Sequence, residues 1–293
     1  MKNVMKRRIF LAIVAFSLST VPVFADLEVG ASVQIHAKAE FDAPLAAHGN
    51  WVQVGPYGRC WRPARVGLEW RPYCSGEWVW TDCGWYWSAD EPWAWACYHY
   101  GGWVYDSSVG WVWVPDVVWA PAWVSWRVGG GHIGWAPLGP PGFGIAIHPR
   151  PELFVFVGAA KFGGPVRSST LIVNNSAIIK QTTVIGGMKR EPHNLGNSTS
   201  QHVMANQGPS VEMVQKASGR SFTAVPIRDA VARTAGRAQT KHATADADRA
   251  RDNSSNQDAG DAARKDNVRS EPERTASSHH SGSFGHKGSG RGK

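Results

Sequence analysis

Two kinds of side chain in this sequence could do chemistry: a few acids and histidines, and many tryptophans. Asp90 and Glu91 are adjacent carboxylates, whereas glycoside hydrolysis uses two carboxylates that face each other across the substrate. Neighbours in an extended chain point to opposite faces, so this pair indicates a turn before Pro92. His99 and His132 have no nucleophile or carboxylate nearby in sequence at a spacing that would indicate a catalytic pair. With no phosphate loop and no dinucleotide fingerprint either, we expect no catalytic site and no cofactor.

Tryptophan is the most unusual part of the composition. All sixteen tryptophans lie between Trp51 and Trp135. A domain of about 90 residues has a small core, and each indole N–H needs a partner, so some rings should reach the surface. We expect Trp51, Trp78 and Trp103 to be core residues because their spacing follows a repeat.

Other tryptophans in the middle of this region are candidates for an exposed aromatic platform, with an interior position as the alternative. Such a platform would bind sugar rings or the apolar patch of a partner protein. The candidate residues are Trp80, Trp85, Trp87, Trp93 and Trp95.

The elements that must position these rings come from a repeat. Units starting at residues 49, 76 and 102 each place a glycine just before a Trp-Val pair, and the lead tryptophans are 27 and 25 residues apart. Four W-x-W triplets, at 78–80, 85–87, 93–95 and 111–113, favour strands because residues i and i+2 of a strand share a face. The sequence therefore predicts an all-β core, an antiparallel meander of about seven to nine short strands that forms a small barrel or a curled sheet.

The four cysteines follow the same period. Cys60 and Cys83 are 23 residues apart, as are Cys74 and Cys97, and 14 residues separate the members of each closer pair. Four cysteines in an exported domain most often form two disulfides, with three possible connectivities. The repeat favours Cys60–Cys74 and Cys83–Cys97, each closing one hairpin. A zinc site is the alternative, but the sequence has no C-x-x-C and no histidine pair at ligand spacing, so we expect no metal.

Several uncommon tryptophan-containing blocks occur in a fixed order: DEPW at 90–93, YHYG at 98–101, WAPAWVSW at 119–126 and GWAPL at 134–138. With these blocks the chain resembles a family of Trp-rich bacterial envelope proteins that is catalogued only as a domain of unknown function. The resemblance covers about residues 41–141 and implies a location, the envelope of a Gram-negative-type bacterium, but no activity. The cysteines are not part of the family pattern.

The two ends of the chain differ from this region. Residues 1–25 combine Lys2, Lys6, Arg7 and Arg8 with a short apolar run and a small residue at the expected cleavage position, which predicts a secretory signal peptide. No later stretch is apolar enough to span a membrane. Residues 228–293 are rich in Ala, Ser, Gly and charged residues and predict a disordered basic tail.

Five segments result from these observations. They are a signal peptide (1–25), an N-terminal strand or linker (26–40), the Trp-rich repeat β-domain (41–141), a short α/β extension (142–227) and the tail (228–293). In the extension we expect one or two strands over 168–187, a short helix from Ser210 that ends before Gly219, and a last strand over 221–227. The glycines at 129–131 predict a hairpin turn.

The distribution of charge along the chain indicates which classes of partner it could bind. Residues 26–188 contain 10 Lys/Arg and 12 Asp/Glu, whereas residues 189–293 contain 17 Lys/Arg and 11 Asp/Glu. The basic surplus of the mature chain therefore lies near its C-terminus, where it could contact anionic surfaces such as lipid head groups or acidic polysaccharide. Nucleic acid is not expected as a partner of an exported protein.

Together these features predict a non-enzymatic exported protein, in the periplasm or alternatively extracellular or on the cell surface. Its Trp-rich domain would bind peptidoglycan, another envelope glycan or an envelope protein. One alternative is a hydrolase of envelope polysaccharide that uses Asp90, Glu91, Asp106 or Asp116. A second alternative is a purely structural domain without a ligand.

Overall fold

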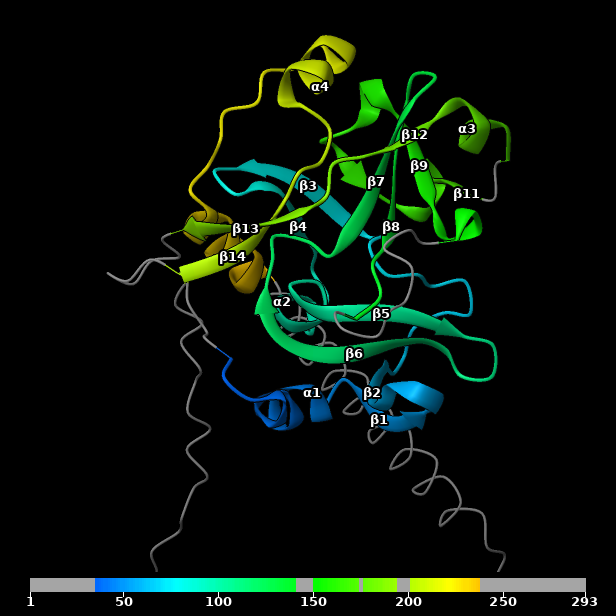
Figure 1. The fold of residues 1–293 in the computed structure, drawn as a ribbon, viewed down its shortest axis with the longest axis vertical. Coiled ribbons are helices and arrows are strands. Elements are labelled where there is room, and N and C mark those ends of the chain that lie inside the picture. The colour runs from blue at the N-terminus through cyan, green and yellow to red at the C-terminus, as the bar shows by residue number, and fades with distance from the viewer. Residues whose placement is uncertain (1–34, 141–149, 174–175, 194–200, 238–293) are drawn as a thin grey trace, which may run out of the picture.

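The structure, a computed structural model, describes residues 35–140, 150–173, 176–193 and 201–237 (Figure 1). The predicted signal peptide and the predicted tail beyond residue 237 lie outside these ranges. Within them, no helix is both long and apolar enough to cross a membrane.

The described strands form three open sheets. Neighbouring strands are antiparallel except for a single parallel pairing, between the strands Gly84–Ser88 and Gln201–Asn206. The first sheet has the order β1 (Gly49–Val54), β2 (Gly58–Pro63), β6 (Gly110–Trp119) and β5 (Tyr100–Asp106). The second has the order β10 (Pro165–Val166), β3 (Gly76–Thr81), β4 (Gly84–Ser88), β14 (Gln201–Asn206) and β13 (Met188–His193). The third has the order β11 (Ile172–Val173), β9 (Val155–Gly158), β8 (His132–Pro137), β7 (Val124–Gly129) and β12 (Thr183–Ile185).

Each repeat unit folds as one hairpin with a tryptophan pair across its two strands. Trp51 lies opposite Trp61 in β1–β2, Trp78 lies opposite Trp87 in β3–β4, and Trp103 lies opposite Trp113 in β5–β6. The hairpin β7–β8, whose turn contains the glycines 129–131, pairs Trp126 with Trp135 in the same way. The Trp-rich region is therefore a series of four hairpins with a shared packing device.

The glycines of the first two repeats leave room for these rings. A Cβ atom added to Gly49 would lie 2.5 Å from the ring of Trp61, and one added to Gly76 would lie 2.8 Å from the ring of Trp87. In both hairpins, the glycine two positions before the lead tryptophan is the flat surface on which the opposite indole lies.

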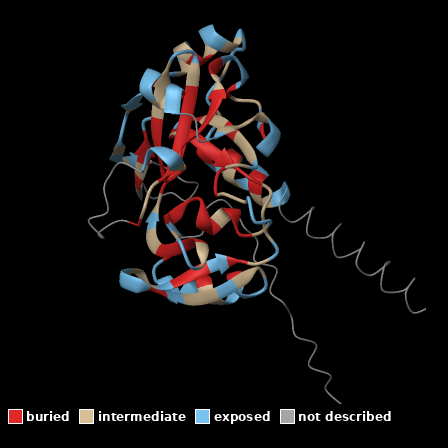
Figure 2. Cartoon of the chain, turned by 90° about the vertical axis from the view of Figure 1, so that its right-hand side faces the viewer, coloured by how far each residue is buried: buried red, intermediate tan, exposed pale blue. Residues whose placement is uncertain are grey.

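The paired indoles meet in one aromatic core between the sheets. Trp78 is at its centre, with ring centroids 4.9 Å from Trp87, 4.4 Å from Trp126 and 5.5 Å from Trp135. Figure 2 shows buried residues concentrated along the central strands, with exposed residues toward the two ends of the molecule. Trp78 and Trp103 are both 2% exposed, which confirms them as core residues.

The first sheet has two different faces, as strand alternation requires. The tryptophans of β1, β2 and β6 belong to the aromatic core. The alternating residues on the other face, among them Val54, Cys60 and Val112, form a separate aliphatic cluster.

Short helices connect and cover the sheets. They are η1 (Lys38–Phe41), α1 (Asp42–Ala46), η2 (Gly55–Tyr57), α2 (Ala94–Cys97), η3 (Pro151–Leu153), η4 (Ala159–Lys161), η5 (Ser168–Thr170), α3 (Ser176–Gln181) and α4 (Val211–Ser218). The predicted helix after Ser210 is confirmed: Ser210 accepts a hydrogen bond from the Met213 N–H, and Gly219 ends the helix in the left-handed conformation.

The C-terminal part of the described chain is a helix over residues 227–237, drawn in orange beside β13 and β14 in Figure 1. Ile227 and Ala230 of this helix are buried in a cluster with Cys83 and Tyr86. Ordered structure therefore extends ten residues beyond the predicted start of the tail at residue 228. The predicted strand over 221–227 is reduced to one parallel bridge between Val225 and Thr81.

The predicted antiparallel, mostly β core is confirmed, with three corrections to its details. The strands divide among three open sheets and do not form one barrel or one curled sheet. The W-x-W triplet at 93–95 is not a strand, because Trp93 is the residue before helix α2. Segment 168–187 contains helix α3 between the short strands β11 and β12.

Candidate functional site

The structure removes most of the predicted aromatic platform from the surface. Trp85 and Trp87 are fully buried, and Trp93 is 7% exposed. Trp80 and Trp95 are partly buried and pack against the same aromatic core. The five rings therefore do not form one exposed surface.

Trp85 has the interior position that was the alternative for these candidates, and residues far along the chain bury it. Its indole N–H donates to the carbonyl oxygen of Pro209 at 2.8 Å. Gly208 also lies against this ring, and Phe222 packs edge-on against it with centroids 5.6 Å apart. All three residues belong to the extension after residue 142, which has no visible link to the repeat in sequence.

The carboxylates of the hydrolase alternative each have a structural partner. Asp90 lies 3.7 Å from the Arg237 guanidinium. Asp106 accepts hydrogen bonds from Ser108 and the Val109 N–H within the β5–β6 turn, which lowers the pKa of its carboxyl. Asp116 accepts a hydrogen bond from the Val118 N–H. Asp90 and Glu91 have different partners, as expected for neighbours in a turn.

Glu91 differs from the other three carboxylates because the pKa of its carboxyl is raised. Burial raises the pKa of its carboxyl to about 7, although its Oε1 accepts a hydrogen bond from the Tyr98 hydroxyl at 3.1 Å. A carboxyl with such a pKa can act as a general acid or base when it contacts a substrate. However, Glu91 does not line the pocket described below.

His99 is a buried core histidine. Its ring is stacked between Tyr86, with centroids 4.5 Å apart, and Trp119, with centroids 5.8 Å apart. Its Nδ1 lies 3.1 Å from the Ala120 carbonyl oxygen. Burial lowers the pKa of His99 to about 4, so the ring is neutral at physiological pH. His132 instead contacts the Gly130 carbonyl oxygen in the β7–β8 turn.

The structure has all four cysteines as free thiols and does not join the predicted pairs. Cys60 lies opposite Val52 in β2, not opposite Cys74, so a Cys60–Cys74 bond would not close a hairpin. Cys83 lies in the cluster beneath the 227–237 helix, whereas Cys97 belongs to the aromatic core. Burial raises the pKa of Cys60 to about 11 and of Cys83 to about 12, so these thiols are weak nucleophiles at neutral pH.

No metal centre is formed by the described residues, in which no group of three or more His, Cys, Asp or Glu side chains could hold an ion. The zinc alternative for the cysteines therefore has no cluster of ligands in this part of the chain.

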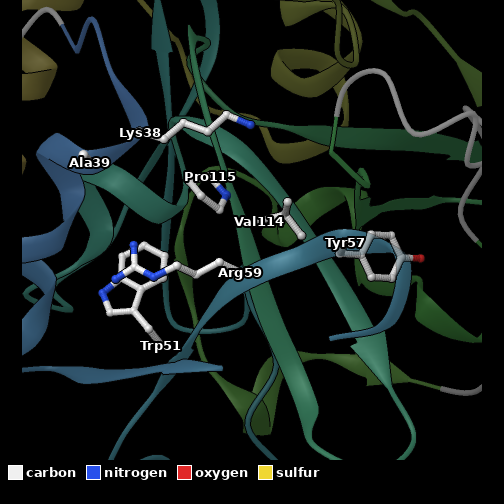
Figure 3. A pocket seen from close by; sticks show the side chains of 7 residues that line it. All are labelled: Lys38, Ala39, Trp51, Tyr57, Arg59, Val114 and Pro115. Atoms are coloured by element: carbon white, nitrogen blue, oxygen red, sulfur yellow. The ribbon is translucent and has the colours of Figure 1, made fainter. Parts of the chain in front are cut away.

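A pocket of about 270 Å³ lies between the first sheet and η1 (Figure 3). It is lined by residues from η1, β1, β2 and β6 and from the short turn between the first two strands. These residues are Lys38, Ala39, Trp51, Tyr57, Arg59, Val114 and Pro115. Two aromatic and two basic side chains thus line one small space, in which the Lys38 ammonium and the Tyr57 ring extend away from Arg59 and Trp51 (Figure 3).

Arg59 and Trp51 are stacked at one side of this pocket, as Figure 3 shows. The guanidinium carbon of Arg59 lies 4.0 Å from the centre of the Trp51 ring, a distance typical of a cation–π contact. Arg59 Nη1 also donates to Asp42 Oδ1 at 2.6 Å. The Trp51 indole and the Asp42 carboxylate therefore fix the orientation of the Arg59 guanidinium.

The strand register accounts for this stacking. Trp51 lies opposite Trp61, and Arg59 is two residues before Trp61 on the same face of β2. Residues in this diagonal relation across an antiparallel pair are within reach of long side chains. Trp51 remains half-buried because β1 is the edge strand of its sheet, so the expectation that it is a core residue is only partly met.

Sequence reasoning missed this pocket. It considered Trp51 only as a core residue and did not single out Lys38, Tyr57 or Arg59. Once a hairpin is placed at 49–63, the diagonal pairing of Trp51 with Arg59 can be deduced from the sequence. The position of Lys38 cannot, because η1 contacts β6 from a distant part of the chain.

Residues 42–142 match the model of a family described as "Family of unknown function (DUF6600)". The match confirms the resemblance to a Trp-rich family of unknown function. All four hairpins with paired tryptophans lie within the matched segment. Trp51, Tyr57 and Arg59 also lie within it, whereas Lys38 precedes it. Comparisons with curated proteins and with solved structures gave no match.

Proposed function

We propose that this is an exported, non-enzymatic protein of the bacterial cell envelope that binds a glycan in the Lys38–Trp51–Tyr57–Arg59 pocket. Export is supported by the basic and apolar pattern of residues 1–25. The envelope, with the periplasm as the specific compartment, is supported by the resemblance of residues 41–141 to Trp-rich envelope proteins.

The composition of the pocket carries the glycan proposal. A sugar ring presents apolar C–H faces and a rim of hydroxyl groups, so it needs apolar walls and a few fixed hydrogen-bond donors. Tyr57 and Pro115 supply such walls, and Arg59 and Lys38 supply donors. A volume of about 270 Å³ suits one sugar unit of a longer chain.

The four carboxylates that a hydrolase would use interact with other groups of the protein, and this supports binding over hydrolysis. Asp90, Asp106 and Asp116 are each engaged with neighbouring protein groups, and Glu91 is bonded to Tyr98 away from the pocket. The basic residues after position 237 would add contacts to anionic surfaces of the envelope.

The test is a calorimetric titration of the mature protein with soluble peptidoglycan and envelope polysaccharide fragments. We expect Tyr57→Ala to weaken glycan binding about tenfold or more, because it removes one wall of the pocket. Tyr105→Ala is the matched control, since Tyr105 is 50% exposed on β5 and does not line the pocket.

Two outcomes would contradict the proposal. Equal binding by wild type, Tyr57→Ala and Tyr105→Ala would place any glycan site elsewhere. Release of new reducing ends by the wild-type protein, abolished in Glu91→Gln, would favour the hydrolase alternative.

A further inference from the structure

We infer that the sugar held in this pocket carries a carboxylate. This inference rests on the proposed function, because it names the chemical class of the same ligand. The chemistry indicated is a monosaccharide-sized acidic sugar, either free or as one unit of an acidic polysaccharide.

Lys38 is the first observation. It lines the pocket, and the described residues provide no ion-pair partner for its ammonium group. The nearest acid in sequence, Glu40, is directed elsewhere: its Oε1 accepts hydrogen bonds from the backbone N–H groups of His36 and Ala37. The pocket therefore contains one cation that the described chain does not neutralise.

Arg59 is the second observation. Its guanidinium has five N–H donors, and the described structure uses one nitrogen, Nη1, for Asp42. Stacking on Trp51 fixes the plane of the group, so a ligand would not have to order a flexible side chain. Asp42 offsets the charge of Arg59 but leaves Nε and Nη2 as donors.

The arrangement favours a carboxylate on a ring over a bare inorganic anion. A planar guanidinium matches the two oxygens of a carboxylate, and the Lys38 ammonium, although it extends away from the guanidinium in Figure 3, adds a second positive charge to the same pocket. The apolar ring atoms of Tyr57 and Pro115 add no charge for a bare ion, whereas they suit the carbon skeleton of a sugar.

The experiment compares acidic sugars with their own methyl esters, which keep the ring and remove the charge. Glucuronic, galacturonic, N-acetylmuramic and N-acetylneuraminic acids, each as acid and as ester, are titrated into the full mature chain at low ionic strength. We expect at least one acid to bind about tenfold or more tightly than its ester. Added salt should reduce this difference.

Variants assign the charge effect to the pocket. Lys38→Gln should weaken binding of the acid but not of its ester, and Lys38→Arg should retain it. Arg62→Gln is the matched control, because Arg62 is an exposed residue of the same strand as Arg59 and does not line the pocket. Acid bound by the basic C-terminal residues would be equal in all these variants, so it cannot produce the expected pattern.

Each contrary result has a distinct meaning. If esters bind as tightly as acids and Tyr57→Ala abolishes both, the glycan proposal holds and the carboxylate inference is wrong. If acids bind equally well to wild type and Lys38→Gln, Lys38 does not recognise the charge, and the inference is also wrong. If neither form of any sugar or envelope fragment binds, both proposals fail.

Discussion

At the scale of single residues, the indole N–H groups show how so many tryptophans fit inside one protein. Several donate to backbone carbonyls outside their own strand: Trp61 to Leu45, Trp103 to Cys97 and Trp135 to Tyr73. The buried N–H of Trp126 donates to the side chain of Asn206. Because an unpaired buried donor costs about 1–3 kcal/mol, these acceptors are as important to the core as the rings.

Some indoles have no such acceptor. The N–H groups of Trp78 and Trp87 are buried without a hydrogen-bond partner among the described residues. These two rings meet edge to face at 4.9 Å, and Trp87 meets Tyr73 edge to face at 5.7 Å. Edge-to-face packing is a favourable arrangement of aromatic rings, and it stabilises this part of the core although the two N–H groups have no acceptor.

The glycine beneath an indole gives a prediction at this scale. We expect Gly49→Ala to lower the free energy of unfolding by about 1–3 kcal/mol, since its Cβ would overlap the ring of Trp61 and the Arg62 carbonyl oxygen. Gly67→Ala is the control, because no atom lies within 4 Å of its added Cβ. Urea unfolding of both variants measures the difference, and equal midpoints would mean that the glycine is not a packing residue.

At the scale of elements, much of the Trp-rich region could be predicted from sequence. The triplets at 78–80, 85–87 and 111–113 lie in β3, β4 and β6, as alternation on a strand requires. The triplet at 93–95 has the same spacing but follows Asp90, Glu91 and Pro92. Acidic residues and a proline at the start of a segment, followed by alanines, favour a helix, and α2 forms there.

What could not be predicted is the contact between elements that are far apart in sequence. Trp85 is buried because residues 208, 209 and 222 cover it, and the pocket exists because η1 lies beside the first sheet. The local pattern of a strand states which side chains share a face. It does not state which face a later segment will cover.

The helix over 227–237 gives a prediction at the scale of elements. Deleting residues 227–293 should lower the free energy of unfolding by about 2 kcal/mol or more, because Ile227 and Ala230 lose their buried contacts. Deleting only residues 238–293 is the matched control and should change stability little.

Thiol labelling supplies a second measure of the same change. Cys83 shares a cluster with Ile227 and Ala230, so it should react faster with a maleimide in the longer deletion. Cys60 lies in a different cluster and should be unaffected. Equal labelling of Cys83 in both deletions, read by peptide mass spectrometry, would show that the helix does not protect it.

At the scale of the whole molecule, two buried groups make opposite contributions to the pH dependence of stability. The pKa of His99 falls from 6.5 to about 4 on folding, so the unfolded chain binds its proton more readily and stability decreases as pH falls through this window. A shift of this size is on the order of 3 kcal/mol. The pKa of Glu91 rises from 4.5 to about 7, so stability decreases as pH rises through that window.

The two windows overlap, which gives a prediction for variants. For the wild type we expect these contributions largely to cancel between about pH 4.5 and pH 6.5. Glu91→Gln should leave the His99 contribution, with stability lost on acidification below about pH 6.5. His99→Gln should leave the Glu91 contribution, with stability lost as pH rises toward about 7.

Urea unfolding at several pH values measures these profiles relative to the wild type, so that other titrating groups cancel. Parallel profiles for the wild type and both variants would contradict the assignment. The assignment would also be contradicted if Glu91→Gln lost stability as pH rises from about 4.5 to about 7.

The tryptophan pairs at the centre of the molecule also have an optical consequence. Indole rings with centroids 4.4–5.5 Å apart, as around Trp78, have coupled electronic transitions. Their exciton bands fall in the far ultraviolet and add to the circular dichroism of the peptide groups. In this protein a far-ultraviolet spectrum therefore reports on side-chain packing as well as on strands and helices. Its loss on heating should follow the separation of the indoles, and strand content calculated from the spectrum would be in error.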